Sequence, residues 1–323
     1  MEIIKGDLRE ALDLVRKNKY LKLYINYRNS NADNILYEND KIVLIHDSNH
    51  TCYLSSKDNT TLKFIGSFED GFQYLTKTES IIFGDVDTSN ISSMIAMFRG
   101  CRSLKTLDVS NFDTSNVQDM RYMFHGCESL EELNLSSFNT ENVNNMSHMF
   151  YNCLSLKQLN LSSFNTEMVE DMGYMFYECS SLKTLDLSSF NTSNVESMYF
   201  MFCKCLDLKK LDLSMFNTSN VKNMFCMFSE CISLKELDLS SFNTEMVKDM
   251  GYMFYLCSSI KELDISNFNV ENVKDMSCMF YGCTSLGKLN LFSFDMSDER
   301  NTTGMLRDCH ELPNEVKESF LKL

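Results

Sequence analysis

The sequence predicts an α/β solenoid, in which coils of one short strand and one short helix stack around a parallel sheet. A segment such as LNLSSFNTENVNNMSHMFYNC returns every 26 residues from about residue 80 to residue 309. Apolar residues within each copy are spaced first for a strand and then for a helix. A fixed period without slips is typical of units that pack only on their neighbours.

A cysteine column marks the period most clearly. It comprises Cys101, Cys127, Cys153, Cys179, Cys205, Cys231, Cys257, Cys283 and Cys309. We therefore expect about nine 26-residue repeats over residues 79–309, an N-terminal α+β capping module over residues 1–78 and a C-terminal cap over residues 310–323.

One coil illustrates the predicted elements. Leu130, Leu133 and Leu135 point inward from a short strand, and the polar pair Asn139-Thr140 suits a turn. The next apolar residues are Val143, Met146, Met149, Phe150 and Cys153. At 100° per residue they fall in one arc, which predicts an amphipathic helix of about three turns. Because the strand recurs in the same sense, the stacked strands form a parallel sheet.

The N-terminal module shows other patterns. Residues Asp7–Asn18 form an amphipathic pattern with Asp7 as N-cap, and Tyr20–Tyr27 alternates like a strand. Further strands are expected at NILYE, KIVLIH, Thr51–Ser55 and Thr61–Ile65, and a short helix at Phe68–Leu75. At the other end, PNEVKESFLKL predicts a capping helix with Val316, Phe320 and Leu321 on one face.

Composition limits the classes of partner and compartment. The formal net charge is −15, which disfavours nucleic acid and anionic membranes and favours basic or neutral partners. The amino terminus lacks an apolar signal region, and no stretch is apolar enough to span a membrane. Thirteen cysteines are then expected to be thiols, and we expect a cytoplasmic protein, or a cell-surface protein if the chain is a fragment.

The pattern CxSLxxLdLSsFNTxxVxxMxxMFxxC resembles the BspA-like leucine-rich repeats, in particular the bacterial-surface-protein subtype called DUF285. The resemblance covers Ile81 to Cys309. It implies a leucine-rich-repeat solenoid that recognises proteins or glycans, often on bacterial or protist surfaces. Residues 1–78 carry no such resemblance.

The cysteine column has two interpretations. Its central members are Cys127, Cys153, Cys179, Cys205, Cys231 and Cys257. Buried structural thiols are one, since cysteine in a core behaves as a small hydrophobe; a redox or metal role is the other. Cys203, Cys226 and Cys278 lie outside the column and are expected on the surface. His46 and His50 have a metal-like spacing, but they fall in a predicted turn.

Two surface patterns are candidate partner-binding sites. The first is a set of aromatic residues on the outward side of the predicted helices: Tyr122, Tyr151, Tyr174, Tyr177, Phe200, Tyr252, Tyr255 and Tyr281. Tyrosine is favoured in interfaces, although these side chains could instead lie half-buried in grooves between helices. The second is an acidic column on the sheet: Asp186, Asp212, Asp238 and Asp264. It could bind a basic partner or a cation, or it could hydrogen-bond to neighbouring serines and backbone.

The sequence therefore predicts a non-catalytic recognition protein that binds a protein partner, or another copy of itself, through the solenoid. The alternative is a BspA-like adhesin for a host protein or glycan. The sequence has no phosphate-binding glycine loop and no hydrolase or zinc-protease motif, and we expect no cofactor and no enzyme activity.

Overall fold

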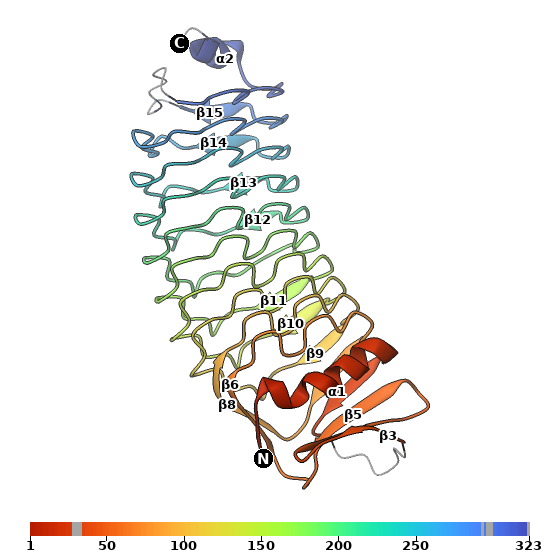
Figure 1. Cartoon of the computed structure of the whole chain (residues 1–323). Helices are drawn as coiled ribbons and strands as arrows, with labels where there is room; N and C mark the ends of the chain where they lie inside the picture. The colour runs from red at the N-terminus through yellow and green to blue at the C-terminus, as the bar shows by residue number, and fades with distance from the viewer. Residues whose placement is uncertain (28–33, 292–293, 295–299, 322–323) are drawn as a thin grey trace. The chain divides into compact units, whose positions relative to one another are not determined.

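The computed structural model describes residues 1–27, 34–291, 294 and 300–321, and it divides into two compact units, Met1–Phe164 (unit 1) and Asn165–Leu323 (unit 2). Each unit is a stack of coils built from short strands and turns (Figure 1). The described residues hold two helices, α1 (Lys5–Asn18) and α2 (Asn314–Leu321), and both lie outside the 26-residue coils. The fold is therefore a β-solenoid, and the prediction of a strand–helix α/β leucine-rich-repeat stack is wrong.

The strands of the coils are short, and those that pair do so in parallel with the strand of the next coil. In unit 1, β10 (Glu132–Asn134) pairs with β11 (Gln158–Asn160). In unit 2, the pairs are β12 (Lys210–Leu211) with β13 (Glu236–Leu237) and β14 (Glu262–Asp264) with β15 (Lys288–Asn290). Leu133 lies opposite Leu159, one period away. Equivalent side chains of adjacent coils therefore stand side by side at the ~4.8 Å spacing of neighbouring strands.

A second parallel ladder runs through the other side of the coils. It consists of single bridges, Ser93 to Asp119 to Asn145 in unit 1 and Asp171 to Ser197 to Asn223 to Asp249 to Asp275 to Asn301 in unit 2. These bridges occupy the segment in which the sequence pattern predicts the start of a helix.

The predicted helix is a series of turns that hydrogen-bond to the next coil. Met149 N donates to Met146 O, three residues back in the same coil, at 3.2 Å. Phe124 N donates instead to Met149 O of the following coil at 2.9 Å. In an α-helix both amides would bond four residues back within the same segment. The backbone groups of this segment thus join coils to one another.

Backbone conformation explains why no helix forms. In this coil His148 and Asn152 have φ values of 59° and 61°, in the left-handed region, which interrupts a right-handed helix. The other coils also have positive φ at both positions, for example at Tyr122 and Gly126. The apolar spacing fits a run of three-residue turns as well as a helix. The predicted inward residues Val143, Met146, Met149, Phe150 and Cys153 are all fully buried, so the core was predicted correctly and the element was not.

Stacked phenylalanines form the centre of each unit. In unit 1 the rings of Phe98, Phe124 and Phe150 are 5.7 Å apart and nearly parallel. In unit 2 Phe176, Phe202, Phe228, Phe254 and Phe280 continue the same arrangement at 5.5–5.7 Å. Offset-stacked rings at this distance add to the burial of their apolar area.

Buried threonines tie the turns of adjacent coils together. Thr114 Oγ1 donates to Asn139 O at 2.8 Å, and Thr218 Oγ1 donates to Asn243 O at 2.7 Å. Thr218 Oγ1 also accepts from Asn243 N at 2.8 Å. Each such hydroxyl therefore satisfies backbone groups that a buried turn would otherwise leave unpaired.

The N-terminal residues continue the solenoid. A six-stranded sheet has the order β3 (Asn34–Glu38), β4 (Ile42–His46), β5 (Thr51–Ser56), β2 (Lys22–Ile25), β7 (Ser80–Phe83) and β9 (Thr106–Asp108). Strands β1 (Glu2–Ile3), β6 (Leu62–Ser67) and β8 (Val86–Ser93) form a second, parallel sheet. The predicted strands of this region are present, and the sheet crosses residue 78 without a break.

Two details of this region differ from the prediction. Helix α1 begins before Asp7, whose carboxylate accepts a hydrogen bond from Ile4 N at 2.9 Å. Phe68–Leu75 is not a helix: Phe68 N and Phe72 N donate to Ser93 O and Met97 O, so these residues form turns like those of the repeats. The inter-coil bonding pattern therefore starts one coil before Ile81.

The C-terminal helix is present as α2, directly after Pro313. Val316 is half-buried, while the side chains of Phe320 and Leu321 lie outside the described part of the chain. Neither described helix has the length and apolar character needed to cross a bilayer. The division between Phe164 and Asn165 falls inside the repeats, and the predicted segments 1–78, 79–309 and 310–323 stay a prediction.

Candidate partner-binding surface

Three positions in each coil create an exposed surface, which we call the strand face. They are the positions of Lys105, Thr106 and Asp108, at the start of the strand and on its outward side. Leu107 lies between them and is half-buried. Because the coils stack in register, each position becomes a column of side chains whose spacing the backbone sets.

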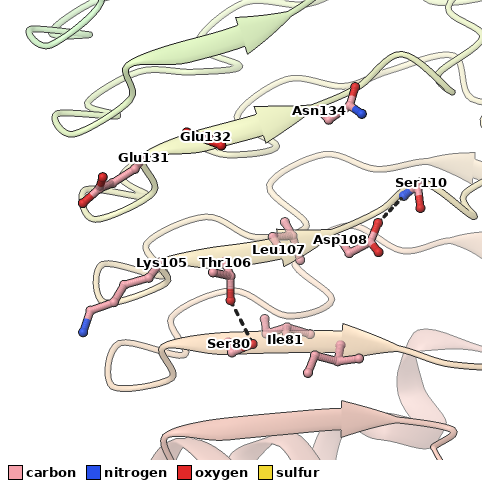
Figure 2. Close-up of a pocket in the computed structure, with 11 residues that line it drawn as sticks. Ser80, Ile81, Lys105, Thr106, Leu107, Asp108, Ser110, Glu131, Glu132 and Asn134 are labelled. Carbon is pink, nitrogen blue, oxygen red and sulfur yellow. Dashed lines mark hydrogen bonds between the residues drawn. The ribbon is translucent and has the colours of Figure 1, made fainter.

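The strand face of unit 1 is hollowed over β7, β9 and β10 (Figure 2). The hollow has a volume of about 600 Å³. Ile82 and Leu107, both half-buried, contribute apolar surface. Polar lining comes from Ser80, Lys105, Thr106, Asp108, Glu131 and Glu132. A second hollow of about 340 Å³ shares Glu132 and Asn134 and extends the depression to β11.

Charges in this part of unit 1 are paired between coils. Lys105 Nζ lies 3.0 Å from Glu79 Oε2, and Lys157 Nζ lies 2.7 Å from Glu131 Oε2. Beside the first of these ion pairs, Thr106 Oγ1 donates to Ser80 Oγ at 3.0 Å, as Figure 2 shows. The first column of unit 1 thus alternates in sign from one coil to the next.

Aspartates of the third column close turns at the end of each strand. Asp108 Oδ1 accepts from Ser110 N at 3.0 Å, and hydrogen bonds from the hydroxyl and amide of Ser110 lower the pKa of this carboxyl. Asn134 makes the same bond to Ser136 N at 3.1 Å without a charge. The turn therefore needs a side-chain oxygen but not a carboxylate.

The predicted acidic column of unit 2 makes these bonds too. Asp186, Asp212, Asp238 and Asp264 are exposed, and each accepts a hydrogen bond of 2.9–3.0 Å from the serine amide two residues ahead. Amide and hydroxyl hydrogen bonds from these serines lower the pKa of all four carboxyls. The hydrogen-bonding interpretation from the sequence thus describes their local contacts, and all four are ionised at neutral pH.

A lysine column in unit 2 escaped the sequence analysis. It comprises Lys183, Lys209, Lys235 and Lys261, which occupy the position of Lys105 in successive coils. All four are exposed, and in the described part of the chain no carboxylate lies within 4.0 Å of their amines. The 26-residue period that starts at Glu79 was the signal that could have shown this column.

The predicted aromatic residues lie on the turns, and all eight are half-buried. Tyr174 stacks on Phe200 at 4.5 Å and 6°, and Tyr255 on Tyr281 at 5.2 Å and 22°. Tyr252 lies 5.3 Å from Tyr255. The side chains therefore cover one another along the columns, although not in grooves between helices, since the described residues of the coils form no helix. A binding role for these residues stays a prediction.

Two histidines take part in the aromatic stack of unit 1. His125 stacks on Tyr151 at 4.4 Å, and His148 stacks on Tyr122 at 4.5 Å. The guanidinium of Arg99 lies 5.3 Å from the centre of the Tyr122 ring. Burial and, to a smaller degree, the charge of Arg99 lower the pKa of both histidines to about 4. Both imidazoles are therefore neutral at pH 7.

The cysteine column makes hydrogen bonds within the core. Cys127 Sγ lies 3.3 Å from Phe98 O, and Cys231 Sγ lies 3.1 Å from Phe202 O, 29 residues earlier in each case. Burial raises the pKa of Cys153 to about 12, and burial raises those of Cys127 and Cys231 as well. The thiols stay protonated and donate weak S–H···O bonds, which agrees with buried structural thiols.

The thiols expected on the surface lie deeper than predicted. Cys203 and Cys226 are buried, with exposed fractions of 3% and 7%, and Cys278 is half-buried. The turns pack these positions against the neighbouring coil, whereas a helix would have turned them outward. Around His46 and His50, as elsewhere in residues 1–27, 34–291, 294 and 300–321, no group of three or more His, Cys, Asp or Glu side chains could hold a metal ion.

Comparison with known proteins finds the family. The family described as "Mycoplasma protein of unknown function, DUF285" matches residues 66–185, 155–238 and 209–319. This chain belongs to the DUF285 family. The first match begins at residue 66, which agrees with the repeat-like turns at Phe68–Leu75.

Other comparisons add little to the family assignment. No curated protein matches the chain. Among solved structures, a chain in the crystal structure of the TLR13–ssRNA13 complex is similar over 78% of this chain and 38% of its own length, with 14% sequence identity and a TM-score of 0.32. The chain thus spans less than half of that protein, and a score this low supports no conclusion about fold or function.

Proposed function

We propose that this DUF285 protein is a non-catalytic recognition protein that binds a protein partner through the strand face of unit 1. The hollow over β7, β9 and β10 is the observation that carries the proposal. Half-buried Ile82 and Leu107 offer apolar contact area, and exposed charged and hydroxyl groups surround them. An apolar centre with a polar rim is the usual anatomy of a protein interface.

The construction of the surface supports recognition in preference to chemistry. Residues that line the hollow include no histidine or cysteine. The inward residues repeat from coil to coil, whereas the outward residues Ser80, Thr106, Glu132 and Gln158 differ at one and the same position. A rigid backbone with varying exposed side chains is how solenoids present binding surfaces.

The family resemblance supports a finer proposal. BspA-like repeats imply adhesion to a host protein or glycan at a cell surface. Against this, all thirteen cysteines are free thiols, which supports a reducing compartment and an intracellular partner. We therefore place the intracellular protein partner first and the surface ligand second.

A bulky substitution in the hollow tests the proposal. Thr106→Arg would fill the space between Ser80 and Glu132, and Thr184→Arg makes the same change at the equivalent position of unit 2. Wild-type and variant chains would be immobilised, incubated with lysate of the source organism, cross-linked and analysed by quantitative mass spectrometry. We expect a protein that the wild type and Thr184→Arg retain and that Thr106→Arg retains about tenfold less, the effect of ~1.4 kcal/mol in binding.

Unchanged circular dichroism and thermal unfolding would show that both variants are folded. Equal retention of every protein by Thr106→Arg and the wild type would exclude the hollow as the binding site. Binding to an array of glycans, with the same dependence on Thr106, would favour the adhesin instead.

A further inference from the structure

The strand face of unit 2 carries two columns of opposite charge. Lys209, Lys235 and Lys261 stand directly before β12, β13 and β14, and Lys183 holds the equivalent position one coil earlier; the aspartate column (Asp186, Asp212, Asp238, Asp264) stands three residues later in the same coils. At ~3.3 Å per residue the columns are separated by roughly 10 Å, and within a column successive charges are ~4.8 Å apart. In unit 1, residues at these two positions line one hollow, so both belong to one surface.

Neither column is needed for the fold. Unit 1 forms the same backbone with alternating charges at the first position, and these charges pair between coils as Lys105–Glu79 and Lys157–Glu131. It closes the same turn with neutral Asn134 and Asn160 at the third position. Like charges stacked on adjacent strands are destabilising. Unit 2 therefore stacks like charges in two columns; serine hydrogen bonds stabilise the aspartates, whereas in the described part of the chain no carboxylate lies within 4.0 Å of the lysine amines.

A symmetric pair of copies can place an opposite charge against each charge of both columns. A two-fold axis that runs along the stacking direction, between two facing copies, exchanges left and right while it keeps each coil at its own level. It places the lysine column of one copy opposite the aspartate column of the other, and the reverse. A two-fold axis along the strands would instead place lysine on lysine. Only the parallel arrangement is complementary, and it is isologous, as two-fold interfaces are.

We propose that a second copy of this chain docks on the strand face of unit 2, in parallel, through these two columns. Lys209 of one copy then faces Asp212 of the other, and the remaining coils repeat the pairing. The same axis places the column between them opposite its own copy, so Lys210, Glu236 and Glu262 each meet a like charge, and the eight Lys–Asp pairs of the four coils must outweigh these three contacts. This surface is distinct from the hollow of unit 1, so Thr106→Arg leaves self-association unchanged.

Charge reversal tests whether these two columns make the contact. An acidic variant carries Lys209→Glu and Lys235→Glu, so that in the two central coils both columns are negative. A basic variant carries Asp212→Lys and Asp238→Lys, so that in the same two coils both columns are positive. Each variant alone would place like charges opposite each other. An equimolar mixture would restore complementary columns on both sides of the axis.

Analytical ultracentrifugation of the full chain at low and high salt measures the outcome. We expect the wild type to dimerise and to dissociate as salt rises. Each variant alone should have a dissociation constant raised at least about tenfold, and the mixture should form a heterodimer. Lys248→Glu with Lys274→Glu is the matched control: it makes the same charge change at exposed lysines outside the two columns and should dimerise like the wild type.

Lysine cannot accept the hydrogen bond that closes the turn at Asp212 and Asp238, so the basic variant loses this bond as well as the charge. A second variant at the same positions separates the two effects. Asp212→Asn with Asp238→Asn keeps the turn bond, as Asn134 does, and removes only the charge. It should weaken dimerisation by less than the reversal does. A wild type that stays monomeric at low salt would overturn the proposal, as would a mixture of the two variants that fails to associate.

Discussion

The strand faces of the two units have the same backbone and different charge patterns. In unit 1 the first column alternates, and Glu131 pairs with Lys157 at 2.7 Å. In unit 2 the same column is lysine in four consecutive coils. The repeat therefore fixes the positions of the side chains, whereas the charges at those positions differ between the two units. A difference that the fold does not require is the best guide to function in such a chain.

The turn faces repeat this contrast. Unit 1 places His125 and His148 at positions where unit 2 has Tyr177 and Phe200. His125, His148 and Phe200 stack on aromatic neighbours, and Tyr177 meets Tyr174 edge-on at 5.4 Å. Packing is thus preserved while one unit gains groups that titrate and the other does not.

The largest predicted effect tests whether the cores of the two units are equivalent, although their surfaces differ. Phe124 in unit 1 and Phe228 in unit 2 are fully buried at equivalent positions. Phe124→Ala and Phe228→Ala should each lower the free energy of unfolding of their own unit by about 3–5 kcal/mol, because each leaves a cavity in the phenylalanine stack. Hydrogen exchange resolved by peptide, in increasing guanidinium chloride, measures each unit separately.

Equal costs in the two units would show that the core is uniform. A cost below ~1 kcal/mol at one position would mean that its coil collapses around the cavity, and the two cores would then not be equivalent.

Sequence periodicity was enough to find the coils, the parallel pairing and every inward position from Val143 to Cys153. It could not distinguish turns from a helix, because apolar residues spaced by three fit both. The deciding property is a positive φ at residues such as His148 and Asn152. Tyr174 and Phe200 adopt it as well, and neither residue type signals it.

The binding surface was harder to predict than the fold. The aspartate column was visible because its type hardly varies. The lysine column was missed because, counted from Glu79, the position begins by alternating and is uniformly lysine only from Lys157 to Lys261. The hollow at Thr106 and Ile82 depends on how far the side chains of adjacent strands project, which a periodic pattern does not contain.

The second prediction uses pH to separate the units. His125 and His148 have a pKa of about 4 in the folded chain, against 6.5 ordinarily. The unfolded chain therefore binds protons first as pH falls, so unit 1 keeps this stability above pH ~6.5 and loses it between pH ~6.5 and ~4. Since both rings are only half-buried, we expect about 1 kcal/mol per histidine.

Peptide-resolved hydrogen exchange between pH 7 and pH 4, corrected for intrinsic exchange rates, measures this loss. His125→Tyr with His148→Phe is the control, because Tyr177 and Phe200 already occupy these positions in unit 2. In that variant the acid sensitivity of the two units should become equal. An unchanged excess loss in unit 1 would assign it to other groups.

The smallest predicted effect exchanges the charge patterns of the strand faces. Glu131→Lys gives the first column of unit 1 a run of like charges from Lys105 onward and breaks the exposed ion pair with Lys157. Lys209→Glu gives unit 2 the alternation of unit 1. Because these side chains are exposed, E131K should slightly destabilise unit 1 and K209E should slightly stabilise unit 2, each by far less than the loss of a core phenylalanine.

Denaturant unfolding of dilute protein at low salt measures both changes. Both should vanish in 1 M salt, where the screening length is about 3 Å. Equal signs for E131K and K209E at low salt would contradict the contrast between the two faces. Opposite signs at low salt and no change at high salt would show that repulsion within the lysine column destabilises the isolated chain. Binding to a surface of opposite charge would then relieve this repulsion.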